Sequence, residues 1–124
     1  MPMVRIWWAL VCLLAVGSSA LYAADCGGLK KVKFEKTDIT LAEPVTSGVL
    51  DIAGAGGPKR DLPGFCRVAG VLRPTSDSEI RFEVWMPEQG WNGRLLGAGN
   101  GGFAGSIYYD QLASYLKRGF AVTG

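Results

Sequence analysis

No histidine occurs among the 124 residues of this sequence. Hydrolases with a serine or cysteine nucleophile usually activate it with a histidine base. The chain also has no serine in a G-x-S-x-G pattern, the sharp turn that exposes the nucleophilic hydroxyl in a large group of hydrolases. These absences exclude a self-contained catalytic triad. We therefore expect the chain to be catalytically inert by itself.

Charged residues are few and nearly balanced, with 13 lysines and arginines against 11 aspartates and glutamates. Four lysines cluster between residues 30 and 36, but Glu35 and Asp38 interleave with them and no ladder of aromatic side chains accompanies the cluster. We interpret the cluster as a solvated surface rather than a nucleic-acid site. The sequence therefore predicts no nucleic-acid partner.

A hydrophobic run lies near the N-terminus. Arg5 precedes an apolar block at residues 6–17 (IWWALVCLLAVG), and small residues follow up to residue 24. This order is typical of a secretory signal peptide. The alternative is an uncleaved membrane anchor, because residues 6–24 carry no charge, but the Gly-Ser-Ser break weighs against it. We predict a signal peptide over residues 1–24 and a secreted or periplasmic mature chain, without stable membrane association after cleavage.

Cysteines are also scarce. Of the three in the sequence, Cys12 lies in the predicted signal peptide, which leaves Cys26 and Cys66. An even pair in an exported protein indicates one disulfide, although each could instead pair with a cysteine outside this sequence. A bridge that closes a loop of about 40 residues stabilises a fold by about 4 kcal/mol in the chain-entropy model.

The first half of the mature chain reads as extended segments. Residues 37–50 are predicted to form an edge strand or extended segment, since Pro44 cannot donate to a central ladder. Residues 53–63 are rich in glycine, proline and charge and are predicted to form a loop. Residues 65–72 read as a strand. Residues 80–86 form the clearest strand, because apolar side chains alternate along them.

A strand–loop–helix–strand unit follows. Residues 94–98 are predicted to form a buried strand, residues 107–117 a helix with Ser106 as its N-cap, and residues 119–124 a second buried strand. Gly119 lies where a left-handed helix cap belongs. Such a unit implies a right-handed crossover onto a parallel strand. The sequence therefore predicts an α/β fold.

The last predicted strand suggests a longer protein. A buried strand needs neighbours on both sides and a covering layer, and we expect this one to remain unpaired in a chain of this length. Residues 25–124 are therefore expected to be the N-terminal, incomplete portion of a larger enzyme domain.

Five glycines lie within residues 97–105 (GAGNGGFAG). A glycine loop between a strand and a helix aims backbone N–H groups at a negative charge, either a phosphate or the oxyanion of an ester-hydrolysis intermediate. Gly97, Gly99 and Gly102 match the dinucleotide fingerprint G-x-G-x-x-G. The export signal and the long β-rich segment before the loop weigh against a dinucleotide site. A purely structural turn is a further alternative.

Three segments resemble the opening of the tannase and feruloyl esterase family: residues 63–70 (PGFCRVAG), 80–87 (IRFEVWMP) and 91–105 (WNGRLLGAGNGGFAG). Members of this family are exported serine esterases that cleave phenolic esters, such as feruloyl and galloyl esters, through an acyl-enzyme. The resemblance implies the N-terminal part of an α/β-hydrolase fold, truncated before the nucleophile elbow.

The resemblance also implies roles for particular residues. Gly102 provides an oxyanion-hole N–H, with Gly101 as a lesser candidate, and Cys26 and Cys66 form a disulfide. The family's serine, aspartate and histidine are absent from this sequence. No cofactor or metal is expected in this chain, and the family's structural calcium is expected in the lid domain of the parent enzyme. The implied substrate is a small phenolic ester or a feruloylated or galloylated compound.

Overall fold

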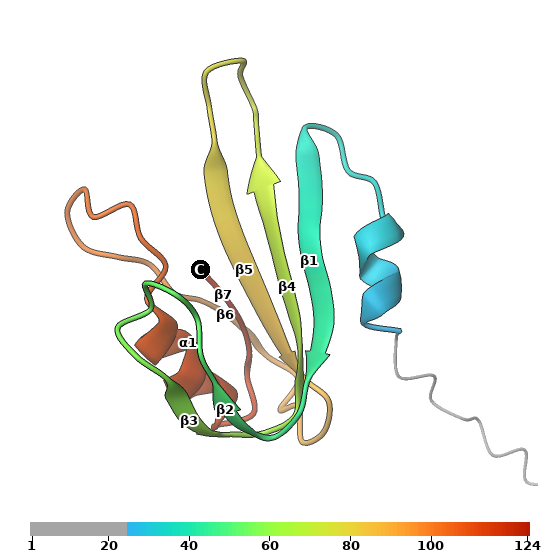
Figure 1. The fold of residues 1–124 in the computed structure, drawn as a ribbon, viewed down its shortest axis with the longest axis vertical. Helices are drawn as coiled ribbons and strands as arrows, with labels where there is room; N and C mark the ends of the chain where they lie inside the picture. Colours follow the sequence, from blue (N-terminus) through green and yellow to red (C-terminus); the bar gives the residue numbers. More distant parts are fainter. Residues whose placement is uncertain (1–24) are drawn as a thin grey trace, which may run out of the picture.

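The computed structural model describes residues 25–124, so the predicted signal peptide lies outside the described residues (Figure 1). These residues form a five-stranded mixed sheet, a two-stranded sheet, one α-helix and one 3-10 helix. In chain order the elements are η1 (Gly27–Lys31), β1 (Thr37–Val45), β2 (Gly48–Leu50), β3 (Lys59–Leu62), β4 (Phe65–Leu72), β5 (Ile80–Pro87), β6 (Leu95–Gly97), α1 (Tyr109–Leu116) and β7 (Ala121–Thr123). Within residues 25–124, no helix is long and apolar enough to cross a membrane.

The large sheet has the strand order β1-β4-β5-β7-β6. β1, β4, β5 and β7 are antiparallel neighbours, whereas β6 and β7 run parallel. The parallel pair joined through α1 confirms the predicted strand–helix–strand unit. Figure 1 shows α1 and the β2–β3 ribbon together beside the sheet, with η1 next to β1 at the other side.

The prediction for residues 37–50 is confirmed in part. β1 is an edge strand and contains Pro44, but it ends at Val45 and a separate short strand, β2, follows. The predicted loop at residues 53–63 is wrong at its end, because β3 pairs with β2 there. β3 reads KRDL, with only its first and last residues buried. Such a pattern lacks the apolar alternation by which a strand is recognised.

The core lies between the large sheet and α1. Its largest fully buried side chains are Trp85, Phe65, Leu112, Leu116 and Val122. The Phe65 and Trp85 ring centroids are 4.8 Å apart. The helix buries Leu112, Ala113 and Leu116, and it packs on β5 and β7.

The buried face of β5 is not the more apolar one that hydropathy indicates. Trp85 and the charged Glu83 point into the core, with 0% and 4% of their surface exposed. Phe82 and Val84, on the other face, are only half-buried. They line an apolar groove of about 290 Å³ with side chains from the η1 region. Burial of Glu83 depends on hydrogen-bond partners, described below.

Two expectations about the last strands are wrong. β7 is not unpaired, because β5 and β6 flank it on both sides and Val122 is fully buried. β6 is not a buried strand: it forms the sheet edge, and Leu95 is 66% exposed. The Leu-Leu run of β6 is typical of a central strand. In the structure, however, it is β7, the later strand in the sequence, that lies between β5 and β6.

The ends of α1 differ in how well the sequence predicts them. The expected N-cap Ser106 is wrong, because Tyr108 occupies that position and makes no side-chain capping bond. Gly119 is confirmed after the C-terminal end, with φ +80°. A Cβ at Gly119 would lie 2.6 Å from the Gly90 carbonyl oxygen, so close packing as well as backbone conformation requires glycine there.

A disulfide joins Cys26 and Cys66, whose Cα atoms are 5.6 Å apart. It confirms the predicted pairing. Cys26 directly precedes η1 and Cys66 is buried in β4. The bridge therefore ties the first described residues to a strand inside the sheet.

Candidate functional site

The glycine loop, residues 98–106, connects β6 to the segment that leads into α1 (Figure 1). It follows the carboxyl end of β6, beside the carboxyl end of the parallel strand β7. Open α/β sheets bind ligands outside the carboxyl ends of their parallel strands. The structure thus places the loop where a ligand site is expected in this class of sheet.

Few contacts define the loop's path. At its start the Ala98 N–H donates to the Thr123 carbonyl oxygen at 2.7 Å. Across the loop the Asn100 side chain donates from Nδ2 to the Ser106 carbonyl oxygen at 2.7 Å. Gly102 and Gly105 have φ values of +61° and +59°, which residues with a Cβ rarely adopt. These two glycines allow the chain to turn back toward the sheet.

The donors of the loop are unengaged. From Gly99 to Ser106, no backbone N–H donates a hydrogen bond to another group of residues 25–124. A Cβ added at Gly99, Gly101 or Gly102 would meet nothing within 4 Å. Packing inside the described chain therefore does not explain the glycines at these positions. Free N–H groups on a backbone without side chains suit the close approach of an anionic or oxyanionic group.

A cleft of about 670 Å³ lies beside the loop. Asn100 and Ser106 line it from the loop, Arg81 from β5 and Tyr109 from α1. Ligand pockets commonly have volumes of about 300–1,000 Å³. The cleft is thus large enough for a small organic molecule, and it borders the loop's polar groups.

Tyr109, which lines the cleft, also belongs to a buried polar cluster around Glu83. Glu83 Oε2 accepts hydrogen bonds from Arg67 Nε at 2.9 Å and Trp85 Nε1 at 2.7 Å. Its Oε1 accepts from Arg67 Nη2 at 2.7 Å and from the Tyr109 hydroxyl at 2.9 Å. We call these four residues the Glu83 cluster. It joins β4, β5 and the first residue of α1.

The cluster changes the acid–base properties of its donors. The hydrogen bond to Glu83 raises the pKa of Arg67. Burial, and then the hydrogen bond to Glu83, raise the pKa of Tyr109. Both shifts favour the protonated form, which is the form that donates to Glu83. Sequence reasoning missed Glu83. The available signal was an arginine at 67 and a glutamate at 83 on two consecutive predicted strands, since opposite charges can pair when such strands lie side by side.

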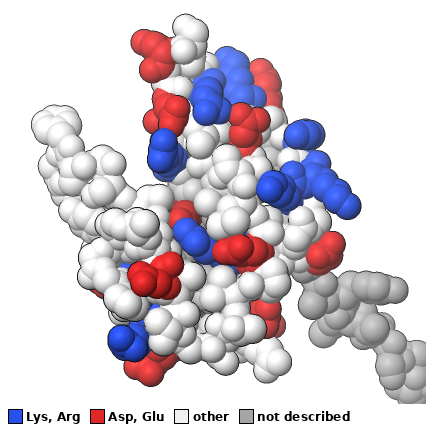
Figure 2. Space-filling model, viewed as in Figure 1, with Lys and Arg blue, Asp and Glu red and all other residues white. Residues whose placement is uncertain are grey.

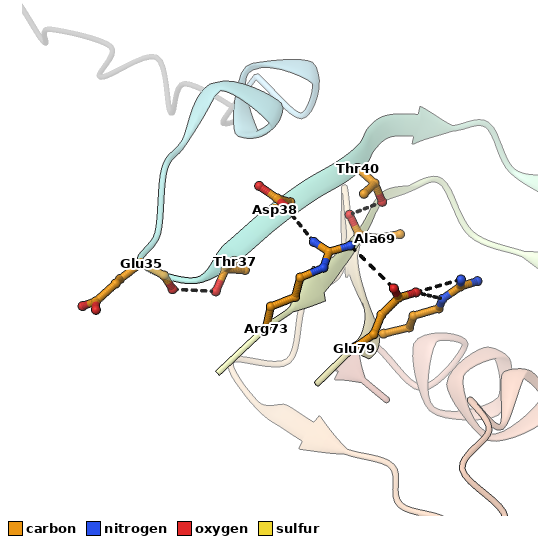
Figure 3. Close-up of polar contacts among 8 residues, drawn as sticks. Glu35, Thr37, Asp38, Thr40, Ala69, Arg73 and Glu79 are labelled. Atoms are coloured by element: carbon orange, nitrogen blue, oxygen red, sulfur yellow. Dashed lines mark hydrogen bonds and ion pairs between the residues drawn. The ribbon is translucent and has the colours of Figure 1, made fainter. Parts of the chain in front are cut away.

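The other arginines of this sheet end form surface ion pairs (Figure 3). Arg73 lies between Asp38 at 2.8 Å and Glu79 at 3.7 Å, and Arg81 reaches Glu79 at 2.9 Å. All of these side chains are exposed, and exposed pairs contribute little to stability. Figure 2 shows blue and red residues interspersed over this face, so no large region of one sign forms there.

The remaining predicted site residues lie as follows. Gly101 and Gly102 are exposed within the glycine loop, and their N–H groups donate no hydrogen bond within residues 25–124. Cys26 and Cys66 form the disulfide described above. In the described part of the chain, no three His, Cys, Asp or Glu side chains are grouped to hold a metal ion.

Two solved structures share this fold. The crystal structure of feruloyl esterase B from Aspergillus oryzae superposes with a TM-score of 0.72 and 31% identity, over 82% of this chain and 21% of that one. The crystal structure of an esterase from Aspergillus oryzae gives a TM-score of 0.71 and 30% identity, over 80% of this chain and 21% of that one. The chain therefore has a mixed α/β fold of the class found in these esterases.

Sequence comparison identifies the family. Residues 66–124 match the family model of tannase and feruloyl esterase. An uncharacterized esterase of Xanthomonas campestris pv. campestris is 44% identical over 112 residues, 88% of this chain and 19% of the relative. A probable feruloyl esterase B of Aspergillus clavatus is 34% identical over 128 residues, 94% of this chain and 24% of the relative. These matches confirm the resemblance to the tannase and feruloyl esterase family, which the family model detects over residues 66–124. The chain spans about a fifth to a quarter of the length of these relatives.

The dinucleotide interpretation of Gly97, Gly99 and Gly102 does not fit the geometry. In that fingerprint the third glycine permits close packing of the helix against the strand. A Cβ at Gly102 would meet nothing within 4 Å, and α1 begins only at Tyr109. Gly102 therefore does not perform that packing role.

Proposed function

We propose that this chain is the first part of a longer serine carboxylic ester hydrolase with an α/β-hydrolase fold, in which the glycine loop supplies an oxyanion-hole N–H. The unengaged donors of the loop carry this proposal. In α/β-hydrolases, one oxyanion donor comes from an early strand-to-helix loop and the other from the residue after the nucleophile. Gly102 is the first candidate for the early donor and Gly101 the second.

The proposed reaction has two stages. A serine outside this chain attacks the ester carbonyl, and the carbonyl oxygen becomes negatively charged in the tetrahedral intermediate. The Gly102 N–H donates to that oxygen. The alcohol then leaves, and water hydrolyses the acyl-enzyme through a second intermediate of the same geometry. The loop acts in both stages because each passes through the same oxyanion.

The free edge of β6 supports a position for the missing nucleophile next to the glycine loop. Among the described strands, β6 has β7 on one side and no neighbour on the other. A further parallel strand paired with that edge would end next to the glycine loop, since parallel strands end at the same side of a sheet. A serine elbow following such a strand would then face the loop's N–H groups.

The proposed substrates are phenolic esters of the feruloyl or galloyl type. Relatives named feruloyl esterase support this class. We also propose that the protein is exported and that its structural calcium lies in a lid domain outside this chain. The residues described here do not fit a calcium site, because they contain no group of carboxylates arranged as ligands.

The isolated chain is predicted to be inert, because it contains neither a histidine base nor a serine elbow. The chain by itself should hydrolyse methyl ferulate or 4-nitrophenyl acetate no faster than buffer. The full-length protein should hydrolyse both esters and should lose this activity after treatment with a serine-directed organophosphate. Turnover by the isolated chain that the organophosphate abolishes would contradict the proposal that the nucleophile and its base lie outside this chain. A full-length protein inactive on all phenolic esters would contradict the proposed function.

A further inference from the structure

The start of α1 is held without a capping side chain. Tyr108 at the N-cap makes no side-chain hydrogen bond to the helix. Uncapped helix starts are less stable, since the first N–H groups lack partners. Because only residues 107 and 108 separate the glycine loop from α1, the position of the helix start limits where the end of that loop lies. Other contacts must therefore fix this position.

Tyr109, the first residue of α1, is anchored to the Glu83 carboxylate. The Tyr109 hydroxyl donates to Oε1 at 2.9 Å. Arg67 binds both carboxylate oxygens, and Trp85 binds Oε2. With both oxygens engaged, and with only 5% of its side chain exposed, the carboxylate cannot rotate freely. It is a fixed acceptor for Tyr109.

The main chain of Glu83 supports the same region. Its N–H and carbonyl oxygen exchange hydrogen bonds with Gly124 at 2.9 and 3.1 Å. A Cβ at Gly124 would lie 3.4 Å from Ile107 Cγ2 and 3.6 Å from the Ala98 carbonyl oxygen. Gly124 thus lies between the two ends of the loop region. Glu83 holds Gly124 through its backbone and Tyr109 through its side chain.

A second polar contact at the helix start is more exposed. Lys59 Nζ donates to Asp110 Oδ1 at 2.6 Å; the Lys59 side chain is only 5% exposed, but that of Asp110 is 87% exposed. Solvent screens such a pair, so it orients the helix less strongly than a buried contact. Of these two polar contacts at the start of α1, the Tyr109–Glu83 hydrogen bond is therefore the stronger constraint.

We infer that Glu83 is a positioning residue for the oxyanion loop: it fixes Tyr109, and through Tyr109 the start of α1, so that the loop presents its N–H groups at the correct place. This inference rests on the proposed function of the loop. A buried carboxylate on a central strand thereby controls a backbone donor that it does not touch. Small displacements of such donors have large effects on rate.

The test is Tyr109→Phe in the full-length enzyme. This substitution removes one hydroxyl and leaves the Arg67–Glu83–Trp85 contacts in place. We expect kcat to fall about tenfold with KM within about twofold, because the misplaced donor acts mainly in the transition state. The matched control is Tyr115→Phe. It deletes the same atom from the same helix, and Tyr115 packs on Phe120 with no hydroxyl hydrogen bond inside residues 25–124. Its kcat should equal that of the wild type.

A double-mutant cycle separates positioning from general destabilisation. If Tyr109 acts through the loop donor, Tyr109→Phe should cost less than about twofold in kcat once Gly102→Pro has removed that donor. A tenfold cost that persists in the Gly102→Pro background overturns the inference. A Tyr109→Phe enzyme with wild-type kcat also overturns the inference. If Gly102→Pro is slow in that case, the proposed function of the loop still stands. A folded Gly102→Pro enzyme with normal kcat overturns the proposed role of the loop and, with it, this inference.

Discussion

Replacing Gly102 with proline in the full-length enzyme should lower kcat by about 10²–10³-fold, or about 3 kcal/mol, the cost of one oxyanion donor. Proline has no N–H, so the proposed hydrogen bond to the oxyanion disappears. KM should change much less, since that hydrogen bond strengthens only as negative charge develops on the carbonyl oxygen. Steady-state kinetics on methyl ferulate measure both parameters.

Proline also strains this position, because its ring requires φ near −65° whereas Gly102 has φ +61°. Gly105→Pro is the matched control for that strain, since Gly105 has φ +59° in the same loop. Gly105→Pro should retain more than about a tenth of kcat. Gly102→Ala keeps the N–H and, despite the strain of a Cβ at φ +61°, should also retain more than about a tenth of kcat. Equal losses in the two proline variants, with unchanged thermal unfolding, would show that loop shape rather than the Gly102 donor is responsible.

Replacing Glu83 with glutamine should lower the free energy of unfolding by about 3–5 kcal/mol, the usual cost of removing one partner from a buried ion pair. The neutral amide leaves the Arg67 charge with only the Glu43 carboxylate, 3.9 Å away and half exposed, as a counterion. Its NH₂ group also faces a site surrounded by donors from Arg67 and Trp85. Chemical denaturation of the full-length protein, followed by tryptophan fluorescence, gives the change.

Glu79→Gln is the matched control for Glu83→Gln. Glu79 also accepts hydrogen bonds from an arginine on β5, Arg81, at 2.9 and 3.2 Å (Figure 3). Its side chain, however, is 50% exposed, against 5% for Glu83. Its replacement should cost less than about 1 kcal/mol. Similar small losses in both variants would mean that the Glu83 cluster does not stabilise the fold.

Local patterns in the sequence predicted most of the large sheet. The alternation at residues 80–86 and the apolar run at 65–72 each correspond to a strand. Gly119 predicted the end of α1, because a left-handed conformation is a local requirement. The disulfide was predicted from the number of cysteines in the mature chain and from the family resemblance. These features depend on neighbours in sequence or on simple pairing.

The features that were missed depend on contacts between distant segments. β3 is a strand because it pairs with β2, and its own composition gives no such signal. Glu83 is buried because Arg67 and Tyr109 come from other elements to meet it. β6 is separated from β5 because β7, which comes later in the chain, is inserted between them. None of these relations can be found from periodicity within a single segment.

The candidate site divides in the same way. The glycine loop was predicted from composition and resemblance, and the structure adds that its N–H groups have no partners within residues 25–124. The support beneath the loop could not be predicted, since it required the register of β4 and β5 and the exact start of α1. The expected N-cap Ser106 illustrates this. Tertiary anchoring at Tyr109 replaces local capping at the helix start.

The central claim is that the loop's backbone holds the oxyanion of an ester-hydrolysis intermediate. A crystal structure of the full-length enzyme, with its active-site serine phosphonylated to mimic the tetrahedral intermediate, tests it most directly. We predict a phosphonyl oxygen about 2.7–3.1 Å from the Gly102 nitrogen, the distance expected for an oxyanion donor. A phosphonyl oxygen bound only by other donors, with the Gly102 N–H directed elsewhere, would contradict the account.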